Sequence, residues 1–161
     1  YTLVYTLSLH DALPICYAID EFVKLELATD GGGEVFMARD FGYNAYSQMV
    51  FTTAETVERH PEAVRQFLHA LQQGWTYALD HKEETVALIL EQYNNGLDPA
   101  YQLASLEKIE ELVRKNGKAP LYPVSPEVLQ QSMVAYKEFG LIEEETDLEE
   151  LLDPRFNPAV E

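Results

Sequence analysis

A chain of 161 residues can bury one moderate core, which predicts one domain or one lobe of a larger fold. Its 28 Asp and Glu residues against 11 Lys and Arg give a formal net charge of -17, and a field of that sign repels nucleic acid and anionic lipid surfaces. The single cysteine, Cys16, excludes an internal disulfide and a Cys-based zinc site, and no apolar run is long enough to cross a bilayer.

Residues 1–16 differ in character from the rest of the chain. The first residue is Tyr1 rather than Met, and residues 5–15 resemble the conceptual translation of a sequencing-adapter oligonucleotide. We therefore expect residues 1–16 to be a non-native leader, which is excluded from fold reasoning. The native segment would then begin near Tyr17 and would be part of a longer protein. A genuine strand and turn ending at Pro14 is the alternative.

The next part of the chain combines one helical pattern with β-prone segments. The apolar residues between positions 17 and 27 fit a helical turn with a frayed end, and residues 29–33 break the pattern with three glycines. Residues 34–38 are predicted to form a short strand, followed by a loop at 40–43. Residues 48–53 are β-prone and uncharged, which predicts a buried strand.

From residue 52 onward the pattern is helical. Thr52 and Glu55 have the spacing of a capping box, which predicts a short helix through Arg59. Pro61 then starts a long helix. Its apolar residues recur at i, i+3, i+4 and i+7 on one face: Val64, Phe67, Leu68, Leu71, Trp75, Ala78 and Leu79. This face predicts a core position for Trp75 rather than a ligand contact.

Further helices are predicted from their start and stop signals. The starts are a cap at 80–83, Asp98-Pro99, Ser125-Pro126 and a cap at Thr146-Asp-Leu-Glu149; the stops are residues 94–96, 116–117, Gly140 and Asp153-Pro154. Residues 118–123 are predicted to be an extended connector. The tail after Pro154 is expected to be loose.

The sequence contains no recognisable catalytic or metal-binding constellation. The four histidines lack the i, i+4 spacing of a zinc-binding helix, and His60 and His81 fall at predicted helix starts. No serine stands in a G-x-S-x-G elbow. We therefore predict no catalytic residues, no metal and no cofactor, and we do not expect an enzyme.

An aromatic-rich loop is the strongest candidate for binding. Phe41, Tyr43 and Tyr46 lie outside any periodic face, so helix packing alone does not require them. Aromatic rings offer a flat apolar surface to a ring-shaped ligand, and the tyrosine hydroxyls and Asn44 can orient it by hydrogen bonds. The alternative is that these rings, with Phe51, seal the join between two lobes.

Five segments carry a family resemblance through their order and spacing: YAIDE at 17–21, DFGYNAY at 40–46, VFTT at 50–53, HPEAVRQFL at 60–68 and GWTYA at 74–78. Together they resemble the carboxy-terminal part of ABC-importer substrate-binding proteins of the thiamine-pyrimidine, nitrate and sulfonate type. The resemblance covers nearly everything from Tyr17 to Phe156. It implies an α/β fold, a fragment of a type II periplasmic-binding-protein fold that is mostly helical with a few short strands.

The resemblance also implies an organisation and a set of ligand-binding residues. Residues 17–46 would finish the second lobe and form the cleft loop, 47–157 would be the return crossing strand and the helical flank of the first lobe, and 158–161 a tail. Glu21 corresponds to an acidic position that accepts a hydrogen bond from a ligand amine, and Tyr46 to an aromatic that lines the cleft. The implied set is completed by four residues: Tyr17, Asp20, Tyr43 and Asn44. Phe22 departs from the proline that many relatives have after the acid.

The implied function is that of an extracytoplasmic solute-binding component of an ABC importer, located in the periplasm or attached to the membrane by a lipid anchor. Its partners would be a small-molecule ligand and the transporter permease, with no nucleic acid and no membrane insertion by this segment. An aromatic wall with a carboxylate suits an aminopyrimidine-like or other heterocyclic ligand, because nitrate and sulfonate call for cationic or amide donors. Two alternatives stay open: a pyrimidine-synthase-like enzyme of the same fold, and the ligand-sensing ectodomain of a signalling receptor.

Overall fold

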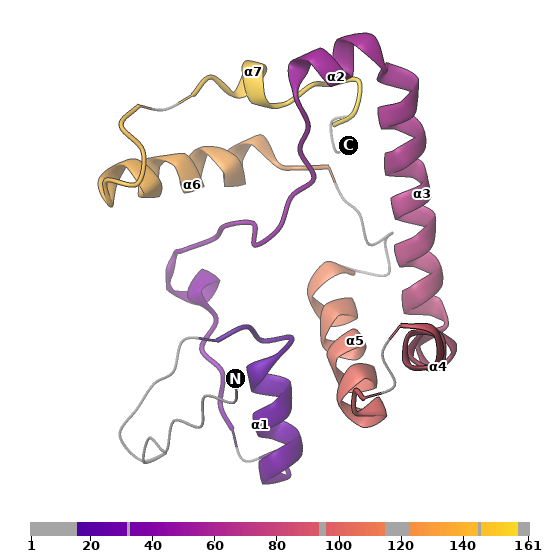
Figure 1. Ribbon diagram of the computed structural model, residues 1–161. Coiled ribbons are helices and arrows are strands. Elements are labelled where there is room, and N and C mark those ends of the chain that lie inside the picture. Colours follow the sequence, from indigo (N-terminus) through magenta and orange to yellow (C-terminus); the bar gives the residue numbers. More distant parts are fainter. Residues whose placement is uncertain (1–15, 32, 94–95, 115–122, 145, 158–161) are drawn as a thin grey trace.

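The computed structural model describes residues 16–31, 33–93, 96–114, 123–144 and 146–157 (Figure 1). Outside these ranges lie residues 1–15 of the predicted leader, two residues of the stop at 94–96, the stop at 116–117, most of the connector and the tail at 158–161. Within them the regular structure is helical, and the elements in chain order are α1 (Glu21–Thr29), the 3-10 helix η1 (Ala38–Phe41), α2 (Ala54–Arg59), α3 (Pro61–Asp80), α4 (Lys82–Gln92), α5 (Pro99–Val113), α6 (Pro126–Glu138) and α7 (Leu148–Leu151).

Several helix ends lie where local sequence chemistry places them. Pro61 is the first residue of α3, where its missing N–H costs nothing. The Asp98 carboxylate accepts hydrogen bonds from two backbone amides at the start of α5, and Ser125 Oγ accepts one from Val128 at the start of α6. Gly140, just past α6, has a φ of 69°, a left-handed conformation that glycine adopts without strain. These predictions are confirmed.

Other caps were predicted at the wrong residue. The side chain that caps α2 belongs to Thr53, not Thr52, and the one that caps α7 belongs to Asp147, not Thr146. Helix α4 begins after His81, whose side chain makes no capping hydrogen bond. Neighbouring Ser, Thr and Asp residues compete for the same amides, so the sequence motif locates a cap only to within a residue or two.

The two predicted strands are absent from the described part of the chain. Residues 34–37 are irregular, residues 38–41 form η1, and residues 47–53 run without regular structure into α2. The segment predicted to be buried is open instead, with Phe51 93% exposed. A β-prone segment becomes a strand only beside another strand that completes its hydrogen bonds. The few short strands of the predicted α/β class are therefore a wrong prediction for the described residues.

The main core lies where the end of α3 meets α4 and α5. Leu79, Val86 and Leu106 are buried there, and four half-buried apolar residues pack against them: Leu90, Leu103, Ile109 and Val113. Only the last turn of α3 reaches this core, since the helix extends well beyond α4 and α5 (Figure 1). Trp75 therefore remains 36% exposed and Phe67 is also exposed, so the predicted core position of Trp75 is wrong.

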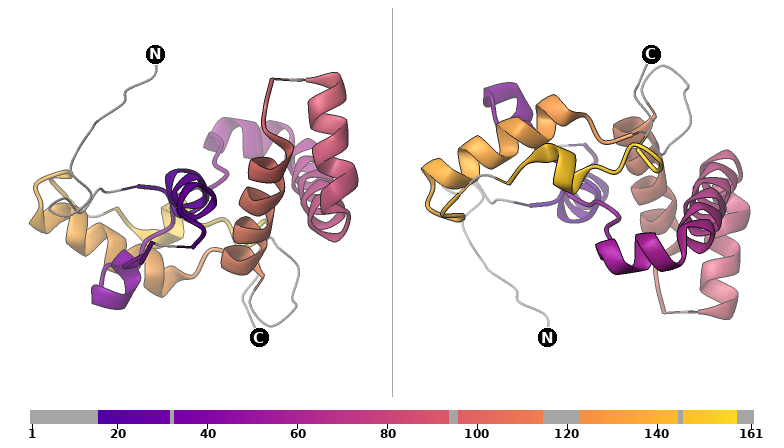
Figure 2. Two further views of the ribbon diagram at one scale, coloured as in Figure 1. Left: turned by 90° about the horizontal axis from the view of Figure 1, so that it is seen from below. Right: turned by 90° about the horizontal axis from the view of Figure 1, so that it is seen from above.

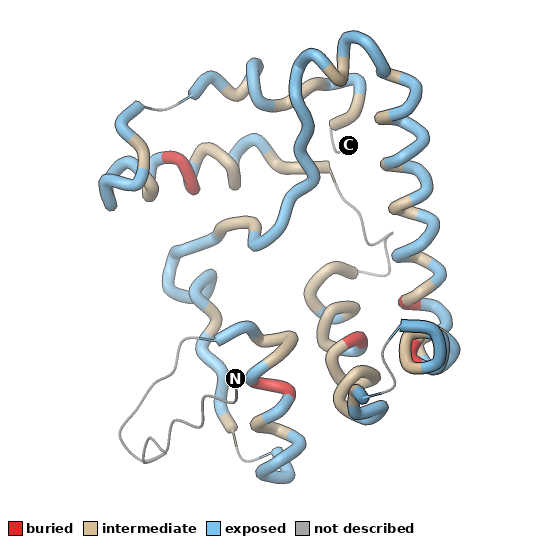
Figure 3. Tube along the Cα trace, in the orientation of Figure 1, coloured by how far each residue is buried: buried red, intermediate tan, exposed pale blue. Residues whose placement is uncertain are grey.

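The other buried residues are separate from this core, as Figure 3 shows. Phe22 and Val23 of α1 are buried where α1 contacts α5, and Ser132 and Met133 are buried in α6. Helices α6 and α7 lie side by side, away from α1 and α4 (Figures 1 and 2). Burial is thus divided among small clusters, and eighteen large apolar residues in the described ranges are exposed against six that are buried.

The segment after α7 is held in place, contrary to the prediction of a loose tail. The Asn157 side chain makes hydrogen bonds to both the N–H and the C=O of Val124, at 2.6 and 3.0 Å. The Phe156 ring lies 5.6 Å from the guanidinium carbon of Arg65 in α3. The tail up to Asn157 therefore joins the start of α6 to the start of α3. No helix in the described ranges is both long and apolar enough to span a membrane.

Candidate functional site

The amino-terminal end of α1 brings two of the predicted ligand-binding residues together. The Tyr17 backbone N–H donates to Glu21 Oε2 at 2.9 Å, and both residues are exposed. Glu21 is the first residue of α1, where a carboxylate is stabilised by the helix dipole. A carboxylate has about four lone-pair positions, so this one contact leaves Glu21 able to accept further hydrogen bonds.

The side chain of Asp20, the neighbouring predicted residue, is already paired with other side chains of the protein. Its carboxylate pairs with Lys24 Nζ at 2.5 Å and accepts a hydrogen bond from the Tyr101 hydroxyl of α5. The hydrogen bond from Lys24, followed by the one from Tyr101, lowers the pKa of Asp20. Ser105 Oγ of α5 donates to the Ile19 carbonyl beside it. These contacts tie the start of α1 to α5.

The aromatic loop follows η1 and runs toward α6. Gly42 has a φ of 91°, which turns the chain out of η1, and the Tyr43 N–H donates back to the Ala38 carbonyl at 3.1 Å. The hydrogen bond between the Tyr43 and Tyr136 hydroxyls raises the pKa of Tyr43. Asn44 is exposed. Of the loop residues that were predicted to bind ligand, Tyr43 thus has a neighbour in α6.

Tyr46 contacts the start of the same helix. Its hydroxyl oxygen accepts a hydrogen bond from the Ser125 N–H at 2.9 Å, and its side chain is half-buried. Because an N–H can only donate, the Tyr46 O–H proton is not used in this contact. Tyr46 and Glu21 have no common partner among their described contacts. The structure therefore places the two principal predicted residues on separate supports.

Two grooves of the described chain lie away from the predicted residues. One, of about 250 Å³, lies between α1 and α5. It is lined by apolar residues (Val23, Leu27 and Ala104) and by charged ones (Glu26, Glu107, Lys108 and Glu111). The other, of about 360 Å³, follows the polar face of α3 to the turn before α4. None of the six predicted ligand-binding residues lines either groove.

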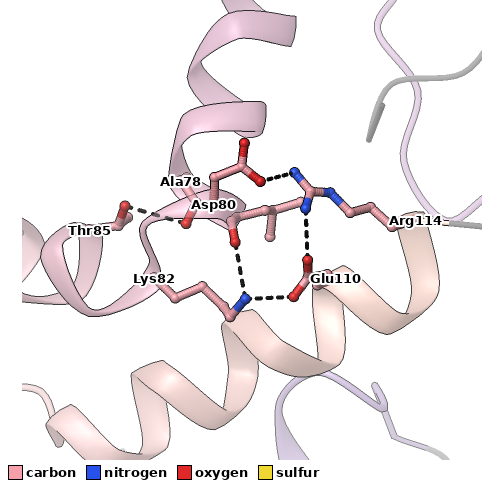
Figure 4. Close-up of polar contacts among 7 residues, drawn as sticks. Ala78, Asp80, Lys82, Thr85, Glu110 and Arg114 are labelled. Carbon is pink, nitrogen blue, oxygen red and sulfur yellow. Dashed lines mark hydrogen bonds and ion pairs between the residues drawn. The ribbon is translucent and has the colours of Figure 1, made fainter. Parts of the chain in front are cut away.

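The most connected polar cluster joins the α3–α4 corner to α5 (Figure 4). Glu110 accepts from Lys82 Nζ at 2.6 Å and from Arg114 at 2.9 Å, and Arg114 also pairs with Asp80 at 2.7 Å. The hydrogen bond from Lys82 is the main reason that the pKa of Glu110 is lowered. The contacts stabilise the helix corner around the main core, and each of these side chains is already paired with another.

Several of these partners were not identified from the sequence. Lys82 and Glu110 are 28 residues apart, and Tyr46 and Ser125 are 79 apart, so no local motif signals either pair. His60 and His81 are the residues that precede α3 and α4, as predicted. No group of three His, Cys, Asp or Glu residues in the described ranges could hold a metal ion.

Comparison with protein families gives one finding that bears on this site. Residues 10–85 match the model of a family described as NMT1/THI5 like, a match of 76 of the 161 residues. The matched range contains all six predicted ligand-binding residues and the aromatic loop. It supports the resemblance to the substrate-binding family. No curated protein and no solved structure matches the chain significantly.

Proposed function

We propose that this chain is a solute-binding component of an ABC importer that captures a small heterocyclic nutrient with an aminopyrimidine-like ring. It acts outside the cytoplasm, in the periplasm or attached to the membrane by a lipid, and delivers the ligand to the transporter permease. The observation that carries this proposal is the family match over residues 10–85, which includes Glu21 and Tyr46. That family consists mostly of substrate-binding proteins and also contains synthases.

The hydrogen-bonding polarity of the two principal residues supports this ligand class. Glu21 is a carboxylate that already accepts from Tyr17, so a ligand group facing it must be a donor such as an amine. Tyr46 already accepts from Ser125, so its O–H proton is available for a ligand acceptor such as a ring nitrogen. An aminopyrimidine offers a donor and an acceptor side by side. Nitrate and sulfonate offer acceptors alone.

In this proposal the ligand binds between two parts of the chain. Glu21 belongs to the start of α1, which is tied to α5, whereas Tyr46 is tied to the start of α6. A ligand that contacts both would bridge these two parts of the chain. Closure of two parts on a ligand is a common mode in periplasmic binding proteins.

Calorimetric titration of the 161-residue chain with 4-aminopyrimidine tests the proposal, with nitrate and methanesulfonate as competing ligand classes. We expect 4-aminopyrimidine to bind and the two anions not to bind. Glu21→Gln and Tyr46→Phe should each weaken binding about tenfold, which corresponds to about 1.4 kcal/mol. Glu26→Gln is the matched control on the same helix and should leave the affinity unchanged.

Two results would decide against the proposal. An absence of 4-aminopyrimidine binding would exclude the ligand class, and equal affinities of Glu21→Gln, Tyr46→Phe and the unsubstituted chain would remove both residues from the site. The synthase members of the matched family define a second outcome. Chemical conversion of a bound pyrimidine by the chain alone would place it with those enzymes instead.

A further inference from the structure

The groove of about 250 Å³ between α1 and α5 is formed by one face of each helix (Figure 1). Residues three and four apart on a helix point the same way, and the lining residues follow this spacing. They are Val23, Glu26 and Leu27 from α1, and Ala104, Glu107, Lys108 and Glu111 from α5. Ala104 has the smallest of these side chains, so the two helices pack together without filling the space between the longer side chains around it.

The apolar part of the groove is only partly covered. Val23 is 2% exposed, so its side chain is already removed from water, whereas Leu27, one turn along the same helix, is 51% exposed. Ala104 is half-buried. A ligand with an apolar portion would cover the open surface of Leu27 beside Val23, and burial of apolar surface favours binding.

The charged part of the groove has an excess of negative charge. Lys108 Nζ pairs with Glu111 Oε2 at 2.6 Å and lies 6.0 Å from the ring centroid of Phe22, so its charge is already compensated. Glu26 is half-buried and Glu107 is exposed, and neither side chain has a hydrogen bond or ion pair within the described part of the chain. Two carboxylates, one on each helix, therefore line the groove without a cationic partner.

The combination of apolar surface and unpaired carboxylates selects a class of ligand. Anions are repelled, and a neutral apolar molecule would remove the carboxylates from water without giving them a partner. No group of three ligating side chains in the described ranges could hold a metal ion. An organic cation satisfies both parts of the groove. The volume of about 250 Å³ lies just below the roughly 300–1,000 Å³ of pockets for drug-sized ligands, so the cation must be small.

We propose that the groove between α1 and α5 is a second binding site, which takes a small, free primary alkylammonium. The ammonium group donates hydrogen bonds to the carboxylates of Glu26 and Glu107, and the alkyl chain covers Val23 and Leu27. A primary ammonium has three N–H donors and no acceptor, which matches a pair of carboxylates. The site is independent of the proposed aminopyrimidine site, because none of the six residues predicted for that ligand lines this groove.

NMR titration of the ¹⁵N-labelled chain with n-hexylammonium chloride tests the site directly. The amide signals of residues 23–27 and 104–111 should shift together with one affinity. Three related molecules each lack one feature of the ligand: methylammonium lacks the apolar chain, hexan-1-ol lacks the charge, and hexanoate reverses it. Each should bind at least about tenfold more weakly, a difference of about 1.4 kcal/mol. Equal affinity for any of the three, or shifts that leave these two segments unchanged, would overturn the proposal.

Two variants separate the groove from the overall charge of the chain. Glu107→Gln should weaken hexylammonium binding about tenfold, the effect of losing a hydrogen bond to a charged group. Glu83→Gln is the matched control, because it removes the same charge from an exposed position in α4 and should leave the affinity unchanged. Ala104→Leu should abolish binding by filling the groove, with retention of the fold checked by circular dichroism. If Ala104→Leu does not fold, Glu107→Gln alone decides, and equal affinities of Glu107→Gln and Glu83→Gln would refute the site.

A comparison with a lysine side chain distinguishes a free amine from a protein partner. Nα-acetyl-lysine amide carries the same ammonium on a four-carbon chain, with peptide groups at the other end. If it binds more tightly than n-butylammonium, the groove recognises a lysine of a protein, and the assignment to a free amine is wrong. Weaker binding of the lysine derivative supports the assignment.

The same variants separate this site from the proposed function. Glu26→Gln should weaken hexylammonium binding and leave 4-aminopyrimidine binding unchanged, whereas Glu21→Gln should do the reverse. If hexylammonium binds as expected and 4-aminopyrimidine does not bind, the proposed function falls and the second site stands. If hexylammonium fails to bind, the second site falls and the proposed function is unaffected. Equal effects of both variants on both ligands would refute the existence of two separate sites.

Discussion

Replacement of Leu79 by Ala should cause the largest loss of stability among the predictions made here. Leu79 is 1% exposed and packs against Val86 and Leu106 where three helices meet. The substitution removes roughly three methylene equivalents, at about 0.8 kcal/mol each, so the lost transfer energy is about 2.4 kcal/mol. Any cavity that remains adds about 24 cal/mol per Å³.

The surroundings of Leu79 limit that cavity contribution. Its partly buried neighbours, such as Leu90 and Leu103, can shift toward the vacated space because they are not enclosed on all sides. We therefore expect a total loss of about 3 kcal/mol in the free energy of unfolding, near the lower end of values for buried leucines. The stability of a small domain is only about 5–15 kcal/mol, so such a loss is easily measured.

Urea unfolding followed by far-UV circular dichroism is the assay. Leu88→Ala is the matched control, since Leu88 lies in α4 and is 46% exposed. It should change the free energy by less than about 0.5 kcal/mol. Equal midpoints for Leu79→Ala and Leu88→Ala would refute the reasoning, because they would show that the junction of α3, α4 and α5 is not the stabilising core.

Two further predictions concern polar groups. Glu110→Gln should lower stability by about 1 kcal/mol at pH 7, because Lys82 and Arg114 lose a charged partner at a half-buried site. The folded-state pKa of Glu110 lies below its ordinary value of 4.5, so this stabilisation is complete above that pH and is lost as the pH falls below it. Unfolding measured from pH 7 to pH 3 should therefore show the difference between the two proteins shrinking in acid; a constant difference would contradict the pairing. Asp98→Ala should cost about 1 kcal/mol through loss of the α5 cap, and Asp98→Asn, which retains the accepting oxygen, should cost much less in the same assay.

The helices were largely predictable because their ends are decided over a few residues. Pro61, Asp98 and Ser125 each mark a helix start that the structure confirms, and Gly140 marks a confirmed stop. A cap satisfies amides two or three residues away, so the necessary information lies within one turn of chain. The same short range explains why the caps of α2 and α7 were predicted one residue early.

Burial was less predictable, because it depends on which elements meet. The face of α3 has a regular apolar spacing along its whole length, yet only Leu79 at its end is buried. Residues 48–53 have the composition of a buried strand, but Phe51 is almost fully exposed. Periodicity and β-propensity describe what a segment could pack against, and a partner in space decides whether it does so.

The candidate site shows the same division. The sequence predicted the aromatic loop and Glu21 as ligand-binding candidates from motifs that are local in the chain, and the family match covers both segments. It did not identify Tyr136, Ser125 or Asn157, whose contacts with Tyr43, Tyr46 and Val124 span more than thirty residues of chain. By itself, the sequence determined where helices begin and which groups can donate or accept. Only the tertiary structure decided which of those groups support one another, because hydrogen bonds between distant segments depend on how helices such as α6 come to lie beside the loop.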